Sequence, residues 1–265
     1  MTIGLKCEKL AAGWSSQRLI EDLNLDLQFS DLAECLPIVG RTGVGKSTLL
    51  YALAGMAVPR SGSVTWRLPT GNAEEASAWQ ITSWSGESRR AFQPAARARP
   101  RSFGFLLQDA AMIPCFTVEE NLLHSMRLRG EMGTRDQMLA RIRAAVAMMA
   151  IEGEHVERLL QVYPGRLSGG QRQRMALAAA TVHDPAVLFA DEPTASLDDE
   201  TGLQILHRIR QWLDGAARLG ERCFVFVTHR LEIIRAGLRA PRMLELRRDV
   251  ADADGLLESN WMDTR

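Results

Sequence analysis

The chain has 265 residues, of which 46% are hydrophobic and 24% are charged, and its 32 basic side chains balance 32 acidic ones. This composition predicts a globular protein of one sizeable domain. The balanced charge disfavours binding of nucleic acid through bulk electrostatics, so we expect no nucleic-acid partner. No apolar run reaches the ~20 residues of a membrane helix, which predicts a cytosolic chain that meets a membrane only through a partner.

Four cysteines are scattered along the chain, at Cys7, Cys35, Cys115 and Cys223. Their spacing fits neither a CxxC pair nor a zinc site. We therefore expect a reducing compartment and four buried, unpaired thiols.

The N-terminal part combines strand patterns with a glycine-rich loop. Apolar and polar residues alternate over 23–29, which predicts a half-buried strand with antiparallel pairing nearby. Residues 36–39 form a short apolar run that ends at Gly40, and a helical pattern follows from Ser47. Pro37 lies inside the second strand and lacks a ladder donor, so we expect a bulge or a local gap there.

Residues 66–101 are the hardest part to interpret. Glycine, serine and proline are scattered among three tryptophans, and five arginines follow: Arg89, Arg90, Arg97, Arg99 and Arg101. We predict a loop-rich insertion here. The arginines indicate a solvated face, with contact to a phosphate or a partner as the alternative.

The C-terminal half predicts helices and then buried strands. Thr134 and Gln137 have the spacing of a capping box, and the apolar spacing after them predicts an amphipathic helix up to Met149. Compact apolar runs at 186–190 and 223–227 predict strands buried on both faces, joined by a crossover helix. This order indicates a parallel sheet. A short apolar stretch and an acidic tail follow.

Residues 40–47 read Gly-Arg-Thr-Gly-Val-Gly-Lys-Ser, which satisfies GxxxxGK[ST] between a strand and a helix. In such a glycine loop the backbone N–H groups surround a phosphate chain, and the helix start adds its positive dipole end. Lys46 is placed to reach the β- and γ-phosphates, and the Ser47 hydroxyl to ligate Mg²⁺. The predicted nucleotide-binding residues of this loop are Gly40, Arg41, Thr42, Gly43, Val44, Gly45, Lys46, Ser47 and Thr48.

Two consecutive carboxylates, Asp191 and Glu192, follow the apolar run 187–190. Such a pair is costly after a buried strand unless a metal ion or water uses it. We predict that Asp191 holds Mg²⁺ through its water shell and that Glu192 is the base that polarises the attacking water. The alternative is a strand that simply ends in polar residues.

The pentapeptide Leu-Ser-Gly-Gly-Gln at 167–171, the signature segment, identifies a family when it is taken with the glycine loop. The chain resembles the ATP-binding cassette ATPases over nearly its whole length. Further elements stand in the family's order, namely Trp14, Gln108, the turn at 196–198 and His229. The resemblance implies an α/β fold, a P-loop NTPase core with a mostly parallel sheet, an N-terminal antiparallel β-subdomain and an inserted α-helical subdomain.

We predict one domain over residues 1–265, with a helical lobe inserted in its core, because a helix-rich, methionine-rich block interrupts the strand pattern between two buried-strand regions. Its expected parts are an antiparallel β-subdomain at 1–35, an ATPase core at 36–114 and 181–247 with the insertion at about 66–101, a helical subdomain at 115–180 and a tail at 248–265.

The resemblance also implies roles for the signature segment and the turn at 196–198. Ser168, Gly169, Gly170 and Gln171 begin a helix, and in the family this anion site faces the γ-phosphate of a second subunit. Asp198 would help to couple the two sites across the dimer. Its alternative role is the N-cap of a helix over 199–213.

Three further residues receive nucleotide contacts by resemblance. The amide oxygen of Gln108 would join the Mg²⁺ and water shell, and His229 would hydrogen-bond the γ-phosphate, which makes it catalytic beside Glu192 and Lys46. Trp14 would stack on adenine. A core tryptophan and a structural histidine are the alternatives.

The expected function is that of an ATP-hydrolysing subunit of an ABC transporter or envelope complex. Two copies would enclose two ATP molecules with Mg²⁺ and drive a separate transmembrane permease-type subunit, at the cytoplasmic face of the inner or plasma membrane. Apolar residues after Gln108 are predicted to contact that partner: Ala110, Met112, Ile113, Pro114 and Phe116. The alternative is that these residues belong to the core.

Residues 163–166 and 190–194 resemble the cassettes of macrolide-efflux, lipoprotein-release and cell-division systems, although importer cassettes share much of the pattern. Ala195-Ser196 departs from the Gly-Asn pair usual in that group. A soluble ATPase that acts on DNA or ribosomes is disfavoured, because the chain lacks a long coiled coil, CxxC modules and a second cassette. An ATP-sensing scaffold is disfavoured because Glu192 and His229 are both present.

Overall fold

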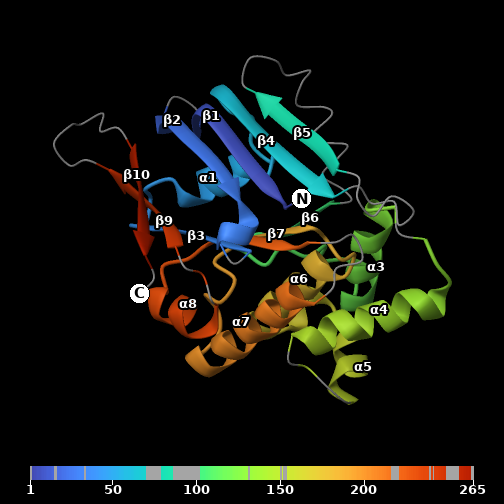
Figure 1. Cartoon of the computed structure of the whole chain (residues 1–265). Coiled ribbons are helices and arrows are strands. Elements are labelled where there is room, and N and C mark those ends of the chain that lie inside the picture. Colours follow the sequence, from blue (N-terminus) through green and yellow to red (C-terminus); the bar gives the residue numbers. More distant parts are fainter. Residues whose placement is uncertain are drawn as a thin grey trace.

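The structure is a computed structural model that describes residues 2–14, 17–32, 34–69, 79–85, 102–130, 132–149, 151, 154–215, 221–238, 240, 242–248 and 257–263. Figure 1 shows two sheets stacked above a group of helices, with further helices to one side.

The central sheet has the strand order β10-β9-β3-β8-β7-β6. Five of its strands run parallel, and β10 pairs antiparallel with β9. All residues of β7 and β8 are buried, which accounts for the apolar sequence of β8 and of β7 up to its last residue, Asp191. In chain order the strands are β3 (Cys35–Gly40), β6 (Phe103–Leu106), β7 (Val187–Asp191), β8 (Cys223–Val227), β9 (Arg242–Arg248) and β10 (Leu257–Asp263).

The second sheet is antiparallel, as expected near the N-terminus, with the order β2-β1-β4-β5. It contains β1 (Gly4–Trp14), β2 (Gln17–Gln28), β4 (Ser61–Pro69) and β5 (Trp79–Ser85). The last two strands overlap the predicted loop-rich insertion at 66–69 and 79–85, and the rest of that segment lies outside the described residues. In β4, Val64, Trp66 and Leu68 alternate inward and are buried. The five arginines of that segment lie outside the described residues.

Helix α1 (Lys46–Leu53) lies between the two sheets (Figure 1). Leu49, Leu50 and Leu53 share one hydrophobic cluster with residues of both sheets, among them Trp66. The indole N–H of Trp66 donates to the carbonyl oxygen of Leu53 at 2.8 Å. The helix that follows the glycine loop is therefore fixed from both sides.

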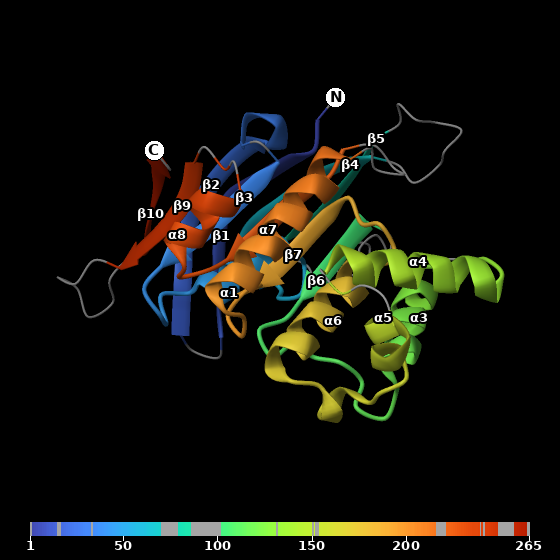
Figure 2. The same ribbon diagram turned by 90° about the horizontal axis from the view of Figure 1, so that it is seen from below.

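The other face of the central sheet is covered by α7 (Asp199–Asp214) and α8 (Leu231–Gly237) (Figure 1). Their apolar side chains pack in a second cluster with Phe224 and Phe226 of β8. Figure 2 shows α3 (Val118–Leu128), α4 (Arg135–Met148) and α5 (Glu154–Leu160) on one side of the molecule, with α6 (Gly169–Thr181) between them and the sheets.

Four helices occupy the segment for which a helical subdomain is predicted: α3 (Val118–Leu128), α4 (Arg135–Met148), α5 (Glu154–Leu160) and α6 (Gly169–Thr181). Short 3₁₀ turns lie at η1 (Phe29–Leu32) and η3 (Pro164–Arg166). The predicted capping box of Thr134 and Gln137 is present at the start of α4, and Thr117 and Glu120 form another at α3.

Pro37 causes no bulge in the pairing with β8, and the other expected outcome, a local gap, is found in the described pairing with β9. The pairing of β3 with β8 keeps its register through Pro37 and Phe226. The carbonyls of Glu34 and Ile38 accept from the N–H groups of Phe224 in β8 and of Thr228 directly after it, so the nitrogen of Pro37 faces the other side. There the described pairing with β9 begins only at Ile38. Pro37 therefore lacks its N–H at a position where the described pairing between β3 and β9 has not yet begun.

Cys115 is a further correction, because it is exposed, whereas Cys7, Cys35 and Cys223 are buried as expected. Burial raises the pKa of the Cys35 thiol to about 12. Over the part of the chain that the structure describes, no helix is long and apolar enough to cross a membrane.

Candidate functional site

Part of the predicted site, namely the glycine loop, Gln108, Asp191, Glu192 and His229, is brought together at one edge of the central sheet. Gly40 ends β3, Asp191 ends β7, Gln108 follows β6 and His229 follows β8. The carboxyl ends of parallel strands share an edge, and ligands of open α/β sheets bind there.

A cavity of about 400 Å³ opens at this edge. It is lined by Leu19, Thr42, Gly43, Gly45, Lys46, Ser47, Thr48, Gln108, Asp191, Glu192, Ala195, Val227 and His229. The lining therefore combines the glycine loop, two carboxylates, an amide and an imidazole.

The glycine loop has a backbone that needs glycine at defined positions. Gly45 is the N-cap of α1 with φ 110°, a left-handed conformation that residues with a Cβ avoid. At Gly40, with φ 143°, an added Cβ would lie 2.5 Å from the carbonyl oxygen of Leu246 in β9. The loop thus curls tightly against the sheet before the first N–H groups of α1, the geometry of an anion site.

Lys46 braces this loop from within. Its Nζ donates to the carbonyl oxygens of Gly40 and Arg41, each at 3.0 Å, and the side chain is buried. Burial lowers the pKa of Lys46, while the nearby charges of Glu192 and Asp191 act in the opposite direction. The ammonium group lies beside the loop, where a phosphate could replace the two carbonyl contacts.

Asp191 offers one free carboxylate oxygen to the site. The residue is 1% exposed, and its Oδ2 accepts from the Tyr51 hydroxyl at 3.0 Å. Its Oδ1 is buried and has no partner among the described residues. A buried, unpaired carboxylate oxygen in a residue that lines the same cavity as Ser47 fits a Mg²⁺ ion, which prefers oxygen ligands.

Glu192 stands in a left-handed backbone conformation, with φ 56°. Its N–H donates to the carbonyl of Val227 at 3.0 Å, and its Oε1 lies 2.8 Å from Nδ1 of His229. Its Oε2 is buried and unpaired within the described structure. The carboxylate is thus held by the histidine with one oxygen left for another donor, such as a water molecule.

The signature segment lies outside this cavity. Ser168 is the N-cap of α6, where its hydroxyl accepts from the N–H of Gln171, and the amide oxygen of Gln171 accepts from the N–H of Ser168. Ser168 and Gly169 are exposed. The N–H groups at the start of α6 are therefore open to a ligand that comes from outside this chain.

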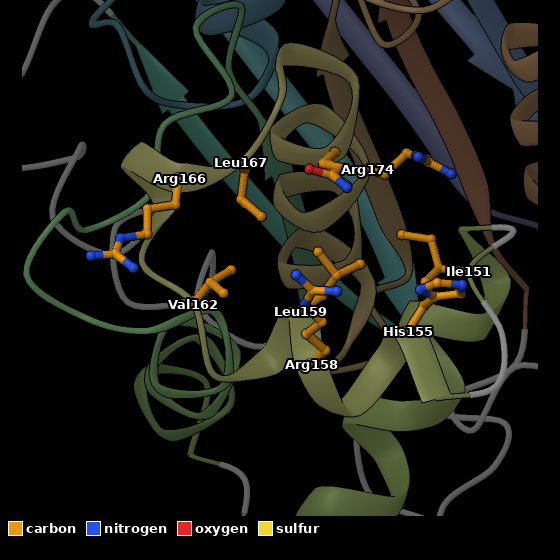
Figure 3. A pocket seen from close by; sticks show the side chains of 9 residues that line it. Ile151, His155, Arg158, Leu159, Val162, Arg166, Leu167 and Arg174 are labelled. Atoms are coloured by element: carbon orange, nitrogen blue, oxygen red, sulfur yellow. The ribbon is translucent and has the colours of Figure 1, made fainter.

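A second cavity, of about 510 Å³, borders the signature segment (Figure 3). Its walls come from α5, from the connection to α6 and from α6 itself. They consist of Ile151, His155, Arg158, Leu159, Val162, Arg166, Leu167, Gln171 and Arg174. It shares no residue with the first cavity and has no carboxylate in its lining.

Asp198 is the N-cap of α7, as the alternative role predicted. Its Oδ1 accepts from the N–H of Thr201 at 2.9 Å, and the Thr201 hydroxyl donates to Oδ2 at 2.8 Å. These hydrogen bonds lower the pKa of the exposed Asp198 carboxyl, and Arg174 acts in the same direction. Asp198 does not line the first cavity. Trp14 ends β1, but its side chain is outside the described part of the chain.

Three polar side chains near the site were not predicted from the sequence: Tyr51, Gln173 and Arg230. Tyr51 holds Asp191. Gln173 contacts the segment after β7, and the Arg230 guanidinium donates to the carbonyls of Thr194 and Leu197 and pairs with Asp199. The one available signal was Gln173, a polar residue within the alanine-rich pattern of α6.

Comparison with known proteins identifies similar sequences. A family profile described as "ABC transporter" matches residues 21–195. The "Lipoprotein-releasing system ATP-binding protein LolD" of Chromohalobacter salexigens is 34% identical over 233 residues, which cover 86% of this chain and 85% of that protein. The "Sulfate/thiosulfate import ATP-binding protein CysA" of Pseudomonas aeruginosa is 29% identical over 86% of this chain, which spans 59% of CysA.

Solved structures share the fold. The dimeric structure of a post-hydrolysis state of the ATP-binding cassette MJ0796, bound to ADP and Pi, superposes with a TM-score of 0.75 at 23% identity. The match covers 98% of this chain and 99% of that one. The predicted fold class, a P-loop cassette with a mostly parallel sheet and an antiparallel N-terminal sheet, is confirmed.

Proposed function

The chain belongs to the ABC transporter family, and we propose that two copies of it enclose two ATP molecules with Mg²⁺ and drive a separate transmembrane subunit. It is an ATP hydrolase of the ABC type. The observation that carries the proposal is the first cavity, where the glycine loop and Lys46 face Asp191, Glu192 and His229.

The phosphate chain of ATP would lie along the glycine loop, with Lys46 at the β- and γ-phosphates. Ser47, Asp191 and Gln108 would hold Mg²⁺, which neutralises charge that develops on the phosphates. The unpaired Oδ1 of Asp191 supports this assignment. Trp14 stays the predicted adenine contact.

Glu192 would accept a proton from the attacking water, with His229 beside the γ-phosphate. Its free Oε2 and its contact with His229 support this role. The imidazole fixes the carboxylate, so the base is oriented before the water arrives.

A second copy of the chain would complete each site. The exposed N–H groups at the start of α6 suit a γ-phosphate, yet Ser168, Gly169, Gly170 and Gln171 lie outside the cavity of their own chain. Asp198 would lie at the same junction between copies. Support comes from MJ0796, whose cassette structure is dimeric.

A membrane partner is proposed because LolD and CysA are named as ATP-binding proteins of a lipoprotein-releasing and an import system. The chain would then act at the cytoplasmic face of the inner or plasma membrane, bound through that partner. Similarity to LolD, together with residues 163–166 and 190–194, supports membership of the macrolide-efflux, lipoprotein-release and cell-division group.

The segment after Gln108 would contact this partner. Ala110 is buried and Met112 packs against the core, as the alternative reading expected, whereas Pro114 is exposed and Ile113 and Phe116 are half-buried. Gln108 itself is exposed and lines the cavity. The proposed contact surface is therefore residues 111–116, next to a residue that senses the nucleotide.

The test is Glu192→Gln, which removes the base and keeps its shape. We expect ATP hydrolysis to fall by on the order of 100-fold or more, with ATP affinity retained and an ATP-stabilised dimer accumulating on size-exclusion chromatography. Asp136→Asn, the same carboxyl-to-amide change on the exposed face of α4, should behave as wild type. Hydrolysis at the wild-type rate in the Glu192 variant would rule out the base.

A further inference from the structure

Gln173 is a buried amide in α6, just before the apolar second half of that helix. It lies in the second turn of α6, five residues after the N-cap Ser168, and is 3% exposed. The residues that follow it, 175–181, are mostly alanine and other apolar side chains. A buried amide is destabilising unless both its donor and its acceptor find partners.

Both ends of this amide bind the segment that follows β7. Its Nε2 donates to the carbonyl oxygen of Glu192 at 2.6 Å, and its Oε1 accepts from the N–H of Ser196 at 2.8 Å. One side chain of α6 therefore closes the turn that contains the proposed base. Figure 2 shows α6 near the ends of β6 and β7.

The backbone of Glu192 needs such support. A φ of 56° is unfavourable for a residue with a Cβ and persists only where neighbours hold it. The N–H of Glu192 donates to Val227 of β8, and its carbonyl oxygen accepts from Gln173 at 2.6 Å and, at the longer distance of 3.2 Å, from the N–H of Ala195. The direction of the Glu192 side chain follows from this backbone, so loss of one contact would move the carboxylate.

We infer that Gln173 is a positioning residue for the catalytic base Glu192, an inference that rests on the proposed hydrolytic role of that glutamate. The same amide joins α6, which begins at the signature segment, to the backbone of the base. A shift of the α6 start on phosphate binding is then passed to Glu192 and to the turn at 196–198.

The experiment compares Gln173→Met with Gln204→Met, the same exchange at an exposed position of α7. The methionine keeps the length and removes both hydrogen bonds. Because a displacement of about 1 Å can slow catalysis on the order of 100-fold, we expect kcat of the Gln173 variant to fall by tenfold to 100-fold. ATP affinity should stay within about twofold of wild type, since binding does not use this amide. The Gln204 variant should match wild type.

A double-mutant cycle separates positioning from packing. In the Glu192→Gln background, Gln173→Met should cause no further loss of hydrolysis, because the group it orients is already gone. Loss of ATP affinity and of the unfolding midpoint in parallel with kcat would overturn the inference in favour of a packing role. So would an additional, multiplicative loss in the double variant.

Gln173→Glu provides a second readout through its pH profile. As a carboxylate it cannot donate to the Glu192 carbonyl, but when protonated it regains an O–H donor. Its activity relative to Gln173→Met should therefore rise as the pH is lowered, and a pH-independent ratio would contradict the inference.

The failure of this inference can be told apart from the failure of the proposed function. If Glu192→Gln hydrolyses ATP normally, the proposed function fails. If it is inactive while Gln173→Met resembles the Gln204 control, only the positioning role fails.

Discussion

His183 makes the stability of the fold depend on pH. The residue lies between α6 and β7, is 3% exposed, and its Nε2 donates to the carbonyl oxygen of Phe103 at 3.2 Å. Its Nδ1 is buried without a partner in the described structure. Burial lowers the pKa of His183 to about 3, and the charges of Arg129 and Arg141 act in the same direction.

The direction of this pH dependence follows from the proton binding of His183 in the folded and the unfolded chain. The unfolded chain binds a proton on this histidine below its ordinary pKa of about 6.5, whereas the folded protein binds it only near pH 3. The stabilisation is therefore complete above pH ~6.5 and is lost progressively as the pH falls toward 3. At about pH 5 the gap of ~1.5 pH units corresponds to ~2 kcal/mol of lost unfolding free energy.

Urea unfolding at about pH 7.5 and about pH 5 measures this loss. The variant His183→Gln keeps a donor for the Phe103 carbonyl and has no titrating ring. Between about pH 7.5 and about pH 5, the unfolding free energy of this variant should fall by ~2 kcal/mol less than that of wild type. This difference does not depend on how stable the variant is at neutral pH. His207→Gln, at an exposed position of α7, is the control. Equal pH-dependent losses in wild type and the His183 variant would refute the reasoning.

Three further outcomes are expected. Tyr51→Phe frees Asp191 to rotate, so the Mg²⁺ concentration needed for half-maximal nucleotide binding should rise severalfold in a titration, and an unchanged value would exclude this positioning role. Ile113→Glu should abolish copurification with the membrane partner while nucleotide affinity stays near wild type; loss of the fold would instead place Ile113 in the core. Gly104→Ala should destabilise the fold by ~1–3 kcal/mol in urea, because the added Cβ would lie 2.1 Å from a carbonyl oxygen of α6, whereas Gly165→Ala meets no atom within 4 Å.

Much of the site was predictable because contiguous patterns mark it. The glycine loop and the carboxylate pair each follow an apolar run, and parallel strands bring their ends to one edge. The cavity accordingly contains Lys46, Ser47, Gln108, Glu192 and His229. Their catalytic and binding roles stay predictions.

Contacts between distant elements were not predictable. Tyr51 and Gln173 act where α1 and α6 cross the strand ends, and no local pattern in the sequence encodes such a crossing. The strand β4 was missed because glycine and serine begin it and proline ends it, which indicates a turn. The turn-forming residues at both ends of β4 therefore hid the strand pattern, which is the alternation of the apolar residues Val64, Trp66 and Leu68.

One side chain of α3, Asn121, holds the segment after Gln108 in place, and this has a consequence for the proposed contact with a partner. Oδ1 of Asn121, in α3, accepts from the N–H of Ile113 at 2.7 Å, and its Nδ2 donates to the carbonyls of Ile113, Phe116 and Thr117. Residues 113–117 therefore lose their backbone freedom when the chain folds, at ~1–2 kcal/mol per residue. A partner helix that docked on the proposed contact surface would meet a rigid template, and its affinity would not be reduced by the entropy of ordering a loop.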